Sequence, residues 1–244
     1  MSKHKSPFLF KKFSVSHHRS SMKVGVDGVL IGCWTDVGKV RRILDVGTGC
    51  GLIALIMAQR CPEAEVVGID IDKASAEEAS VNVANSSWAD RMQILQGSFP
   101  ERLVSLKENR FDLIVSNPPY FDSGVSDIAT SRERARHQGS LSPFSLLHSS
   151  RTFLMSDGKL AMIIPSDLAS ELETAAVNLG YSLMRKCLVR GHEGVPYKRT
   201  LLQWIYNNAY SCKEIATEYL TLETGHNNPT DDYRNLCKDF YLKF

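Results

Sequence analysis

The segment Leu44-Asp45-Val46-Gly47-Thr48-Gly49-Cys50-Gly51 stands between a strand-like run at 41–46 and an apolar helical stretch at 52–60. Glycine reaches positive φ values at little steric cost and leaves room for a ligand against the backbone. A turn that opens a helix also presents free N–H groups to an anionic part of a ligand. The segment therefore predicts the strand–turn–helix unit that begins a cofactor-binding α/β domain.

Short apolar runs alternate with helical stretches along the chain on both sides of this segment. We expect strands at 41–46, 65–70, 92–96, 111–116, 158–164, 182–189 and 200–207, and helices at 21–40, 52–60, 73–86, 141–154 and 166–179. Such alternation is typical of a parallel sheet with helices on both faces. The last two strands are joined by a basic loop without a helix, which makes them antiparallel. The prediction is a Rossmann-like α/β fold with a seven-stranded, mostly parallel sheet and an antiparallel C-terminal strand.

The two ends of the chain differ from this core. Residues 1–23 hold six of the 29 basic residues and none of the 27 acidic ones, so the remainder carries a net charge of −4. Phe8, Phe10 and Phe13 are interleaved with the lysines. This arm suits a phosphate backbone and stacked bases, or it is a solvated tail. We expect a basic arm at 1–23, one domain at 24–208, and an extension at 209–244 packed on that domain, with strand-like 219–223 and helical 231–241.

Composition excludes several classes of protein. A hydrophobic fraction of 43% and a charged fraction of 23% are ordinary for a globular chain of 244 residues. Six widely spaced cysteines form no C-x-x-C pair, which argues against a zinc site and a disulfide framework. No apolar stretch is long enough for a secretory signal or a membrane span. We expect a cytoplasmic monomer without a metal or a membrane partner.

Two carboxylates indicate which cofactor the glycine turn holds. Asp70 ends the second strand, where a carboxylate accepts both ribose hydroxyls of a nucleoside. A dinucleotide fingerprint would place its third glycine at position 52, which is leucine. Asp45 would repel phosphates but suits an amino group such as that of methionine. S-adenosylmethionine is therefore favoured over NAD, with Asp45, Gly47, Thr48, Gly49, Gly51 and Asp70 as its binding residues.

Asn117-Pro118-Pro119-Tyr120 follows directly on the fourth predicted strand, at the edge where open α/β sheets place their ligands. The Asn117 amide oxygen and the Pro118 carbonyl, fixed by two prolines, are two acceptors for the two protons of an aromatic amino group. The Tyr120 ring offers a flat face for a flipped base, and Phe121 adds to it. A proline-rich turn is the alternative for this motif alone. Its position beside the glycine turn favours methyl transfer to an exocyclic nitrogen, with adenine N6 as the leading target.

With these motifs in place, the chain resembles the class I methyltransferases of the N6-adenine type. Within that class it resembles the bacterial tRNA adenine-N6 methyltransferases that modify the adenine beside the anticodon of a valine tRNA. The stretches that carry this resemblance are 22–34, 44–51, 117–120, 134–137 with 140–141, and 240–244.

The resemblance implies tRNA as the partner and adenine 37 of a valine tRNA as the target. It places Asn117 near both the adenine and the methyl group, and Lys23 and Asp27 at the border of the cofactor pocket. The simpler alternative for Asp27 is the N-cap of the helix that follows. Ser98 stands where such enzymes commonly have an acid that reads the cofactor adenine. Basic side chains past the catalytic loop would meet RNA phosphates or belong to a solvated loop: Arg132, Arg134, Arg136, His137 and, in a second loop, Arg190, His192, Lys198 and Arg199.

Two other functions remain open at this stage. The Asn-Pro-Pro-Tyr corner also suits the side-chain amide of a protein glutamine. Enzymes of that kind usually carry an N-terminal helical domain, and only about forty residues precede the glycine turn here. The second alternative is a non-catalytic RNA-binding module with the same fold, against which the intact Asn117 and Asp70 argue.

Overall fold

The computed structural model describes residues 6–20, 22–105, 110–119, 141–206, 215–225 and 228–244. Within these ranges the strands are β1 (Phe8–Leu9), β2 (Ser14–Val15), β3 (Arg42–Val46), β4 (Glu65–Asp70), β5 (Met92–Gln96), β6 (Phe111–Ser116), β7 (Leu154–Pro165), β8 (Tyr181–His192), β9 (Arg199–Tyr206), β10 (Thr217–Gly225) and β11 (Asn228–Pro229). The helices are α1 (Val26–Trp34), α2 (Leu52–Arg60), α3 (Lys73–Ala84), α4 (Glu101–Ser105), α6 (Pro143–Ser150), α7 (Ala169–Asn178) and α8 (Asp231–Cys237), with 3₁₀ turns at Ala89–Arg91 and Ser166–Leu168. None of the helices in these ranges has the length and apolar character needed to cross a bilayer.

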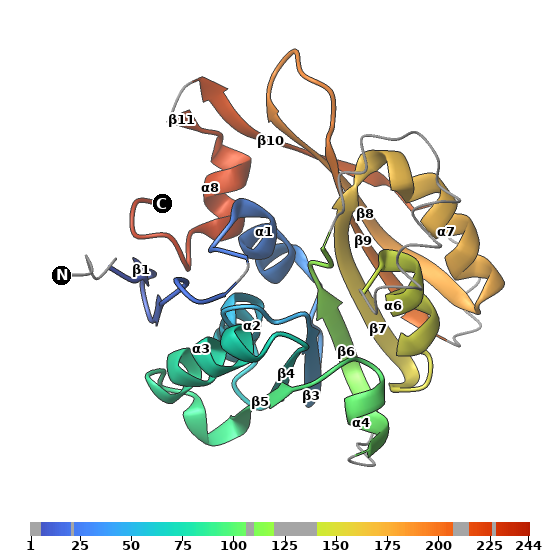
Figure 1. The fold of residues 1–244 in the computed structure, drawn as a ribbon. Helices are drawn as coiled ribbons and strands as arrows, with labels where there is room; N and C mark the ends of the chain where they lie inside the picture. The colour runs from blue at the N-terminus through green and yellow to red at the C-terminus, as the bar shows by residue number, and fades with distance from the viewer. Residues whose placement is uncertain (1–5, 21, 106–109, 120–140, 207–214, 226–227) are drawn as a thin grey trace.

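One large sheet organises the molecule, with the strand order β11-β10-β8-β9-β7-β6-β3-β4-β5 (Figure 1). Strands β3 to β7 are parallel, and β9 runs antiparallel to both β7 and β8. The predicted Rossmann-like α/β fold is confirmed. The predicted number of seven strands is wrong, because the C-terminal stretch adds β10, parallel to β8, and the short β11.

Side chains alternate between two apolar cores on the two faces of the sheet. Ile43 of β3 belongs to the core that contains residues of α1, α2 and α8, whereas its neighbour Leu44 belongs to the core that contains residues of α4, α6 and α7. The same alternation holds in β6, where Leu113 and Ile114 belong to opposite cores. Figure 1 shows the two layers, with α1, α2, α3 and α8 on one side of the sheet and α4, α6 and α7 on the other. Burial on both faces explains why the central strands lack a polar–apolar alternation.

Several element boundaries differ from the sequence-based prediction. The helix expected over 21–40 is limited to Val26–Trp34, and the one expected over 141–154 begins at Pro143 behind a Ser142 capping box and ends at Ser150. Strand β7 starts at Leu154, four residues before the predicted start, because its first part pairs with Phe111 of β6. Capping and pairing partners, which lie outside each segment, set these limits.

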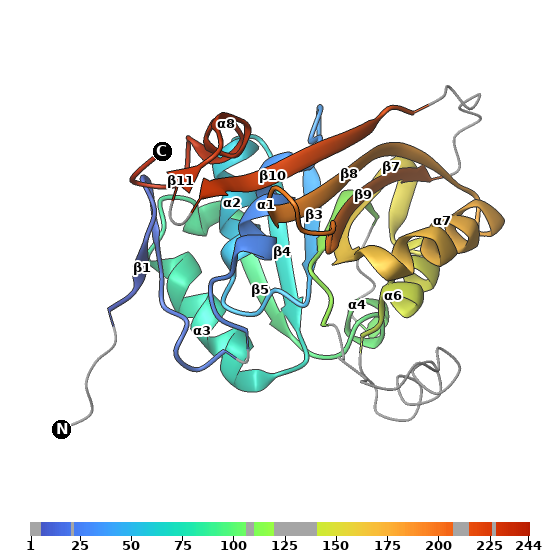
Figure 2. The ribbon, with the colours of Figure 1, turned by 90° about the horizontal axis from the view of Figure 1, so that it is seen from above.

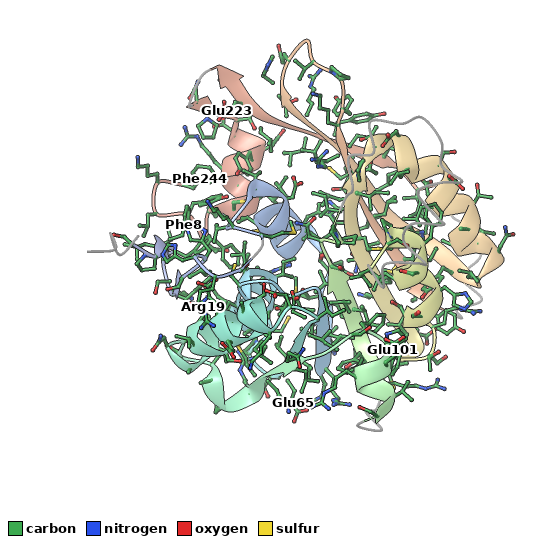
Figure 3. The ribbon with its side chains drawn as sticks, viewed as in Figure 1. Phe8, Arg19, Glu65, Glu101, Glu223 and Phe244 are labelled. Atoms are coloured by element: carbon green, nitrogen blue, oxygen red, sulfur yellow. The ribbon has the colours of Figure 1, made fainter. Side chains whose placement is uncertain are left out.

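The N-terminal segment packs into the same core as the sheet and the C-terminus. Phe10 and Phe13 are buried and stack at 4.6 Å between ring centroids, and Phe10 forms a β-bridge with Tyr241. Lys11 donates hydrogen bonds from its Nζ to the carbonyls of Lys238 and Phe244. Figure 3 shows Phe8 and Phe244, from opposite ends of the chain, on the same side of the molecule. These phenylalanines therefore stabilise the fold instead of offering free faces to bases.

The C-terminal extension is joined to the core by polar contacts as well. Glu218 of β10 forms an ion pair with Arg185 at 2.9 Å and accepts a hydrogen bond from the Trp34 indole at 3.0 Å. Tyr233 and Cys237 of α8 belong to the core cluster of α1 and α2. Domain limits at residues 23 and 208 stay a prediction, since both ends of the chain share this core.

Phe13→Ala should lower the free energy of unfolding by about 3 kcal/mol, because it leaves a cavity against Phe10 and Trp88. Leu9→Ala is the matched control. Leu9 is 56% exposed, and its loss should change stability by less than about 0.5 kcal/mol. Urea unfolding followed by circular dichroism measures both, and equal stability of the two variants would contradict the packing of this segment.

Candidate active site

The glycine turn crosses from the end of β3 to the start of α2 over the neighbouring strand β4. The backbone N–H groups of Gly47 and Thr48 donate to the carbonyl of Ile69 at 2.9 and 3.0 Å. Gly47 and Gly49 have φ values of 71° and 55°, a region that residues with a side chain rarely adopt. The turn therefore needs glycine at these positions, as the sequence predicted.

Asp70 ends β4 and faces this turn. Its Oδ2 accepts a hydrogen bond from the Gly49 N–H at 2.8 Å, and its Oδ1 accepts one from the Asp72 N–H at 2.9 Å. Burial raises the pKa of the Asp70 carboxyl, and the two N–H donors oppose that shift. Each carboxylate oxygen has a second lone pair, so Asp70 retains the capacity to accept two hydroxyl donors.

Asp45 is completely buried behind the turn. Its Oδ2 accepts hydrogen bonds from the Thr48 hydroxyl at 2.7 Å and from the Ala54 N–H at 3.0 Å. Its Oδ1 has no hydrogen-bond partner among the described residues. Burial raises the pKa of this carboxyl to about 7. Asp45 thus joins the turn to α2, and because it lines neither cavity described below, its contact with a cofactor stays a prediction.

Two adjoining cavities lie over the turn, with volumes of about 260 and 210 Å³. They share Met22, Gly47, Gly49 and Asn117 as lining residues. The larger one, here called the α1 cavity, continues toward the start of α1 and also contacts Lys23, Asp27 and Thr48. The smaller one, here called the β4 cavity, continues past Asp70 to Ile71, Ser98, Phe99 and Leu141. Two linked cavities suit an elongated ligand with chemically different ends.

Asn117 stands where the two cavities meet, directly after β6. It is 9% exposed, and Pro118 beside it is buried. The Ser116 hydroxyl donates to the carbonyl of Val46 at 2.7 Å, which fixes the end of β6 to the end of β3. The sequence-based placement of Asn117 next to the glycine turn therefore agrees with the geometry. Tyr120, Phe121, Arg132, Arg134, Arg136 and His137 lie outside the described residues.

A segment of the N-terminus, residues 16–20, holds Met22 and Lys23 against the cavities. The buried Glu78 carboxylate of α3 accepts hydrogen bonds from the N–H groups of His18, Arg19 and Ser20 at 2.7 to 3.1 Å. Asn82 lies one turn further along α3. Its amide oxygen accepts a hydrogen bond from the Ser16 N–H, and its amide nitrogen donates one to the Ser16 carbonyl. The Asn82 amide also donates to the carbonyl of Cys50 in the glycine turn at 2.8 Å. No sequence signal marked Glu78 or Asn82, whereas Met22 opens the stretch 22–34 that carries the family resemblance.

Asp27 lies in the first turn of α1, and its side chain contacts strand β9, which comes much later in the chain. The N-cap of α1 is Gly25, so the alternative that Asp27 caps this helix is wrong. Its carboxylate forms an ion pair with Arg199 at the start of β9, at 2.9 Å. The helix starts without a side-chain cap because its N-cap residue is glycine.

The remaining predicted residues are placed as follows. The Ser98 hydroxyl donates to Glu101 at 2.7 Å and lines the β4 cavity, so its contact with a cofactor stays a prediction. Gly51 caps α2 with a φ of 84°. Lys198 is exposed in the turn between β8 and β9. No three His, Cys, Asp or Glu side chains group as metal ligands within the described ranges.

The Asp45 carboxyl predicts a pH dependence of stability. Between pH 3.8 and about 7 the folded chain keeps a proton on Asp45 that the unfolded chain has released. The free energy of unfolding should therefore fall as the pH rises through this window. Asp45→Asn removes the proton and should flatten the dependence in urea unfolding at pH 5 and pH 7.5, whereas the exposed Asp90→Asn should keep it. The same slope in Asp45→Asn as in the unmodified chain would disprove this assignment.

Comparison with known proteins identifies the family. A family model described as the methyltransferase small domain matches residues 28–178. Three curated proteins named tRNA1(Val) (adenine(37)-N6)-methyltransferase match almost end to end. The one from Bacteroides fragilis is 40% identical and covers 97% of this chain and 98% of its own. Those from Trichodesmium erythraeum and Yersinia enterocolitica are each 37% identical over 97% of this chain, and over 98% and 93% of their own.

Solved structures support the same fold. A predicted O-methyltransferase from Agrobacterium tumefaciens superposes with a TM-score of 0.65 at 20% identity, over 88% of this chain and 96% of its own. A 16S rRNA N2 G1207 methyltransferase from T. thermophilus, solved with AdoMet and guanosine, superposes with a TM-score of 0.54 at 20% identity. The superposition covers 81% of this chain and 50% of the other. The nearly full-length similarity places this chain in the methyltransferase small domain family, among the bacterial tRNA1(Val) (adenine(37)-N6)-methyltransferases.

Proposed function

We propose that this enzyme transfers a methyl group from S-adenosylmethionine to N6 of an adenosine in tRNA, adenosine 37 of a valine tRNA. The observation that carries the proposal is the position of Asn117 at the junction of the α1 and β4 cavities. The relatives at 37–40% identity carry this activity in their names, and the similarity covers 97% of the chain. A tRNA substrate supports a cytoplasmic location.

The residues that line the two cavities fit S-adenosylmethionine. Asp70 has two lone pairs left for ribose hydroxyls, and Ile71 and Phe99 supply apolar surface for an adenine ring in the β4 cavity. In the α1 cavity, Lys23 suits the carboxylate of the methionine part, and Asp27 suits its ammonium group. Gly47 and Gly49 keep side chains out of the passage between the two. When bound, S-adenosylmethionine supplies an electrophilic methyl group on a sulfonium sulfur.

Asn117 and Pro118 act on the target amino group. An aromatic NH₂ group is a weak nucleophile because its lone pair is delocalised into the ring. The Asn117 amide oxygen and the Pro118 carbonyl accept hydrogen bonds from its two N–H protons, which favours a tetrahedral nitrogen and stabilises its developing positive charge. The pyrrolidine ring of Pro118 fixes its φ, and the Ser116–Val46 hydrogen bond fixes the strand end before it. The acceptors are therefore held in place before the substrate arrives, and alignment supplies most of the rate.

The direct test uses the purified protein, S-adenosylmethionine with a labelled methyl group, and a transcript of the valine tRNA. Nucleoside digestion and mass spectrometry should detect N6-methyladenosine. A transcript with guanosine in place of the target adenosine is the matched control and should take up no label. Failure of the adenosine transcript to accept methyl groups, in the presence of demonstrated cofactor binding, would overturn the proposal.

Asn117→Ala and Asp70→Ala should affect different steps, methyl transfer in the first variant and cofactor binding in the second. Asn117→Ala removes one acceptor for the target amino group and should lower kcat at least about 100-fold. Its cofactor Kd, measured by calorimetry, should stay within about threefold of the original. Asp70→Ala should instead raise the cofactor Kd by about 10- to 100-fold, since it removes a charged acceptor of ribose hydroxyls. An Asn117→Ala variant with normal kcat would refute the assigned role of the corner.

Glu78→Ala should weaken cofactor binding although Glu78 lines neither cavity. The change removes the acceptor of three backbone N–H groups, so the segment that carries Met22 and Lys23 loses its anchor. We expect the Kd for S-adenosylmethionine to rise about tenfold, equivalent to ~1.4 kcal/mol. The exposed Glu63→Ala serves as the control of equal charge change. An unchanged Kd in a folded Glu78→Ala variant would show that the segment does not shape the cavities.

A further inference from the structure

The turn between β8 and β9 lies at the same edge of the sheet as the active site. Strands β6 and β7 are parallel, and Pro165 at the C-terminal end of β7 pairs with Arg199 at the start of the antiparallel β9. Arg199 in turn pairs with Val189 near the end of β8. Residues 190–198 therefore project from the edge at which β6 ends and Asn117 begins. Figure 1 shows this turn beyond the end toward which the β6 arrow points, and Figure 2 shows it beside α1.

The backbone of this turn is fixed on both sides. The Lys198 N–H donates to the carbonyl of Val189 at 3.0 Å, and the Lys198 carbonyl accepts from the Ser166 N–H at 3.1 Å. The Thr200 hydroxyl donates to the Ser166 hydroxyl at 3.0 Å. The exposed Lys198 side chain thus extends from a rigid position.

Four side chains form a surface patch next to this turn, here called the aromatic patch: the half-buried Arg190 and Tyr197 and the exposed Lys198 and Tyr219. The Arg190 guanidinium lies 5.1 Å from the centroid of the Tyr197 ring, and its Nε donates to the Thr221 hydroxyl at 2.8 Å. The Tyr219 ring of β10 lies 5.5 Å from the Tyr197 ring at an interplanar angle of 57°. Tyr219 is 62% exposed. Arg190 and Tyr197 therefore support a tyrosine ring whose surface is largely open to solvent.

An ion pair connects the aromatic patch to the α1 cavity. Arg199, next to Lys198, pairs with Asp27 at 2.9 Å, and Asp27 lines that cavity. Lys198 of the patch and Arg199, which pairs with a residue of the cavity wall, are thus neighbours at the start of one strand. The strands along this edge follow in the order β10, β8, β9, β7 and β6, so the patch and Asn117 lie at the same edge of one sheet.

We propose that the aromatic patch binds a single-stranded nucleotide of the RNA beside the target adenosine. Its base stacks on Tyr219, and Lys198 contacts its phosphate. This inference rests on the proposed function. It assigns to the aromatic patch the binding of the RNA next to the target adenosine. Unpaired loop bases are recognised by stacking on aromatic side chains, and every base has such a face. The positive charges of Lys198 and Arg190 favour a nucleic acid, whose phosphates are negatively charged, over a protein surface that is poor in acidic residues. Two acidic residues lie close to the turn: Glu193 follows His192 in the chain, and Glu223 is opposite His192 in the register of β10 and β8.

The test compares Tyr219→Ala, Tyr219→Trp and Lys198→Ala with two controls on the opposite edge of the sheet. The controls are Val177→Ala, which is 69% exposed near the end of α7, and Lys39→Ala, which is exposed before β3. Each protein is assayed with the valine tRNA transcript for kcat, KM and RNA affinity at several salt concentrations. Cofactor Kd is measured in parallel. An anticodon stem-loop with 2-aminopurine beside the target adenosine reports stacking by fluorescence quenching.

Tyr219→Ala should raise the KM for tRNA about tenfold with kcat within about twofold, and Tyr219→Trp should retain the original KM. Quenching of 2-aminopurine should be lost in Tyr219→Ala and kept in Tyr219→Trp. Lys198→Ala should weaken RNA binding and reduce the slope of log K against log salt by about one. The two controls should behave as the original protein, and cofactor Kd should be the same in all variants.

The inference is overturned if the unmodified enzyme methylates tRNA and Tyr219→Ala retains its KM and its quenching. It is also overturned if Tyr219→Ala changes the oligomeric state by light scattering without changing RNA affinity, since the patch then contacts another protein chain. An unmodified enzyme that binds tRNA with the expected quenching but transfers no methyl group would instead refute the proposed function and leave the patch as an RNA contact.

Discussion

The hydrogen bonds from Gly47 and Thr48 to the carbonyl of Ile69 hold the glycine turn across the end of the neighbouring strand, and the rest of the site depends on them. They bring the Gly49 N–H to the Asp70 carboxylate, so that two parallel strands share one rigid edge. The Ser116–Val46 hydrogen bond adds β6 to that edge and sets the position of Asn117. The two cavities and the corner at Asn117 are consequently parts of one hydrogen-bonded frame.

Two buried carboxylates complete this frame in different ways. Glu78 receives three backbone N–H groups, which provide the polar contacts that a buried carboxylate requires. Asp45 receives only a hydroxyl and one N–H on a single oxygen, and its burial raises the pKa to about 7. The first anchors a segment of the N-terminus beside the cavities, and the second fastens the turn to α2. Both act on the site through the backbone that they hold.

The sequence was sufficient to predict those parts of the site whose residue types stand at the ends of recognisable strands. The glycine turn and the Asn117 corner each directly follow an apolar strand and Asp70 ends one, so their shared edge followed from the parallel pattern alone. Three features were beyond reach because they depend on distant partners. Phe10 and Phe13 face Tyr241 and Trp88 instead of solvent, Glu78 meets a segment some sixty residues earlier, and β10 joins the sheet through β8. A charge pattern indicates exposure only when such partners are absent.

The direction of β9 has a consequence for how substrate and cofactor meet. A helical crossover after β8 would have returned the chain to the opposite edge, as it does between the parallel strands β3 and β4. The antiparallel β9 instead starts at the active-site edge, and its Arg199 is thereby available to Asp27 of α1. The same reversal places Tyr197 and the exposed Lys198 at that edge, with Tyr219 of the parallel β10 beside Tyr197. One change of strand direction therefore places a basic, aromatic surface at the same edge of the sheet as the glycine turn and Asn117, which is the geometry that a second contact to a large nucleic-acid substrate would require.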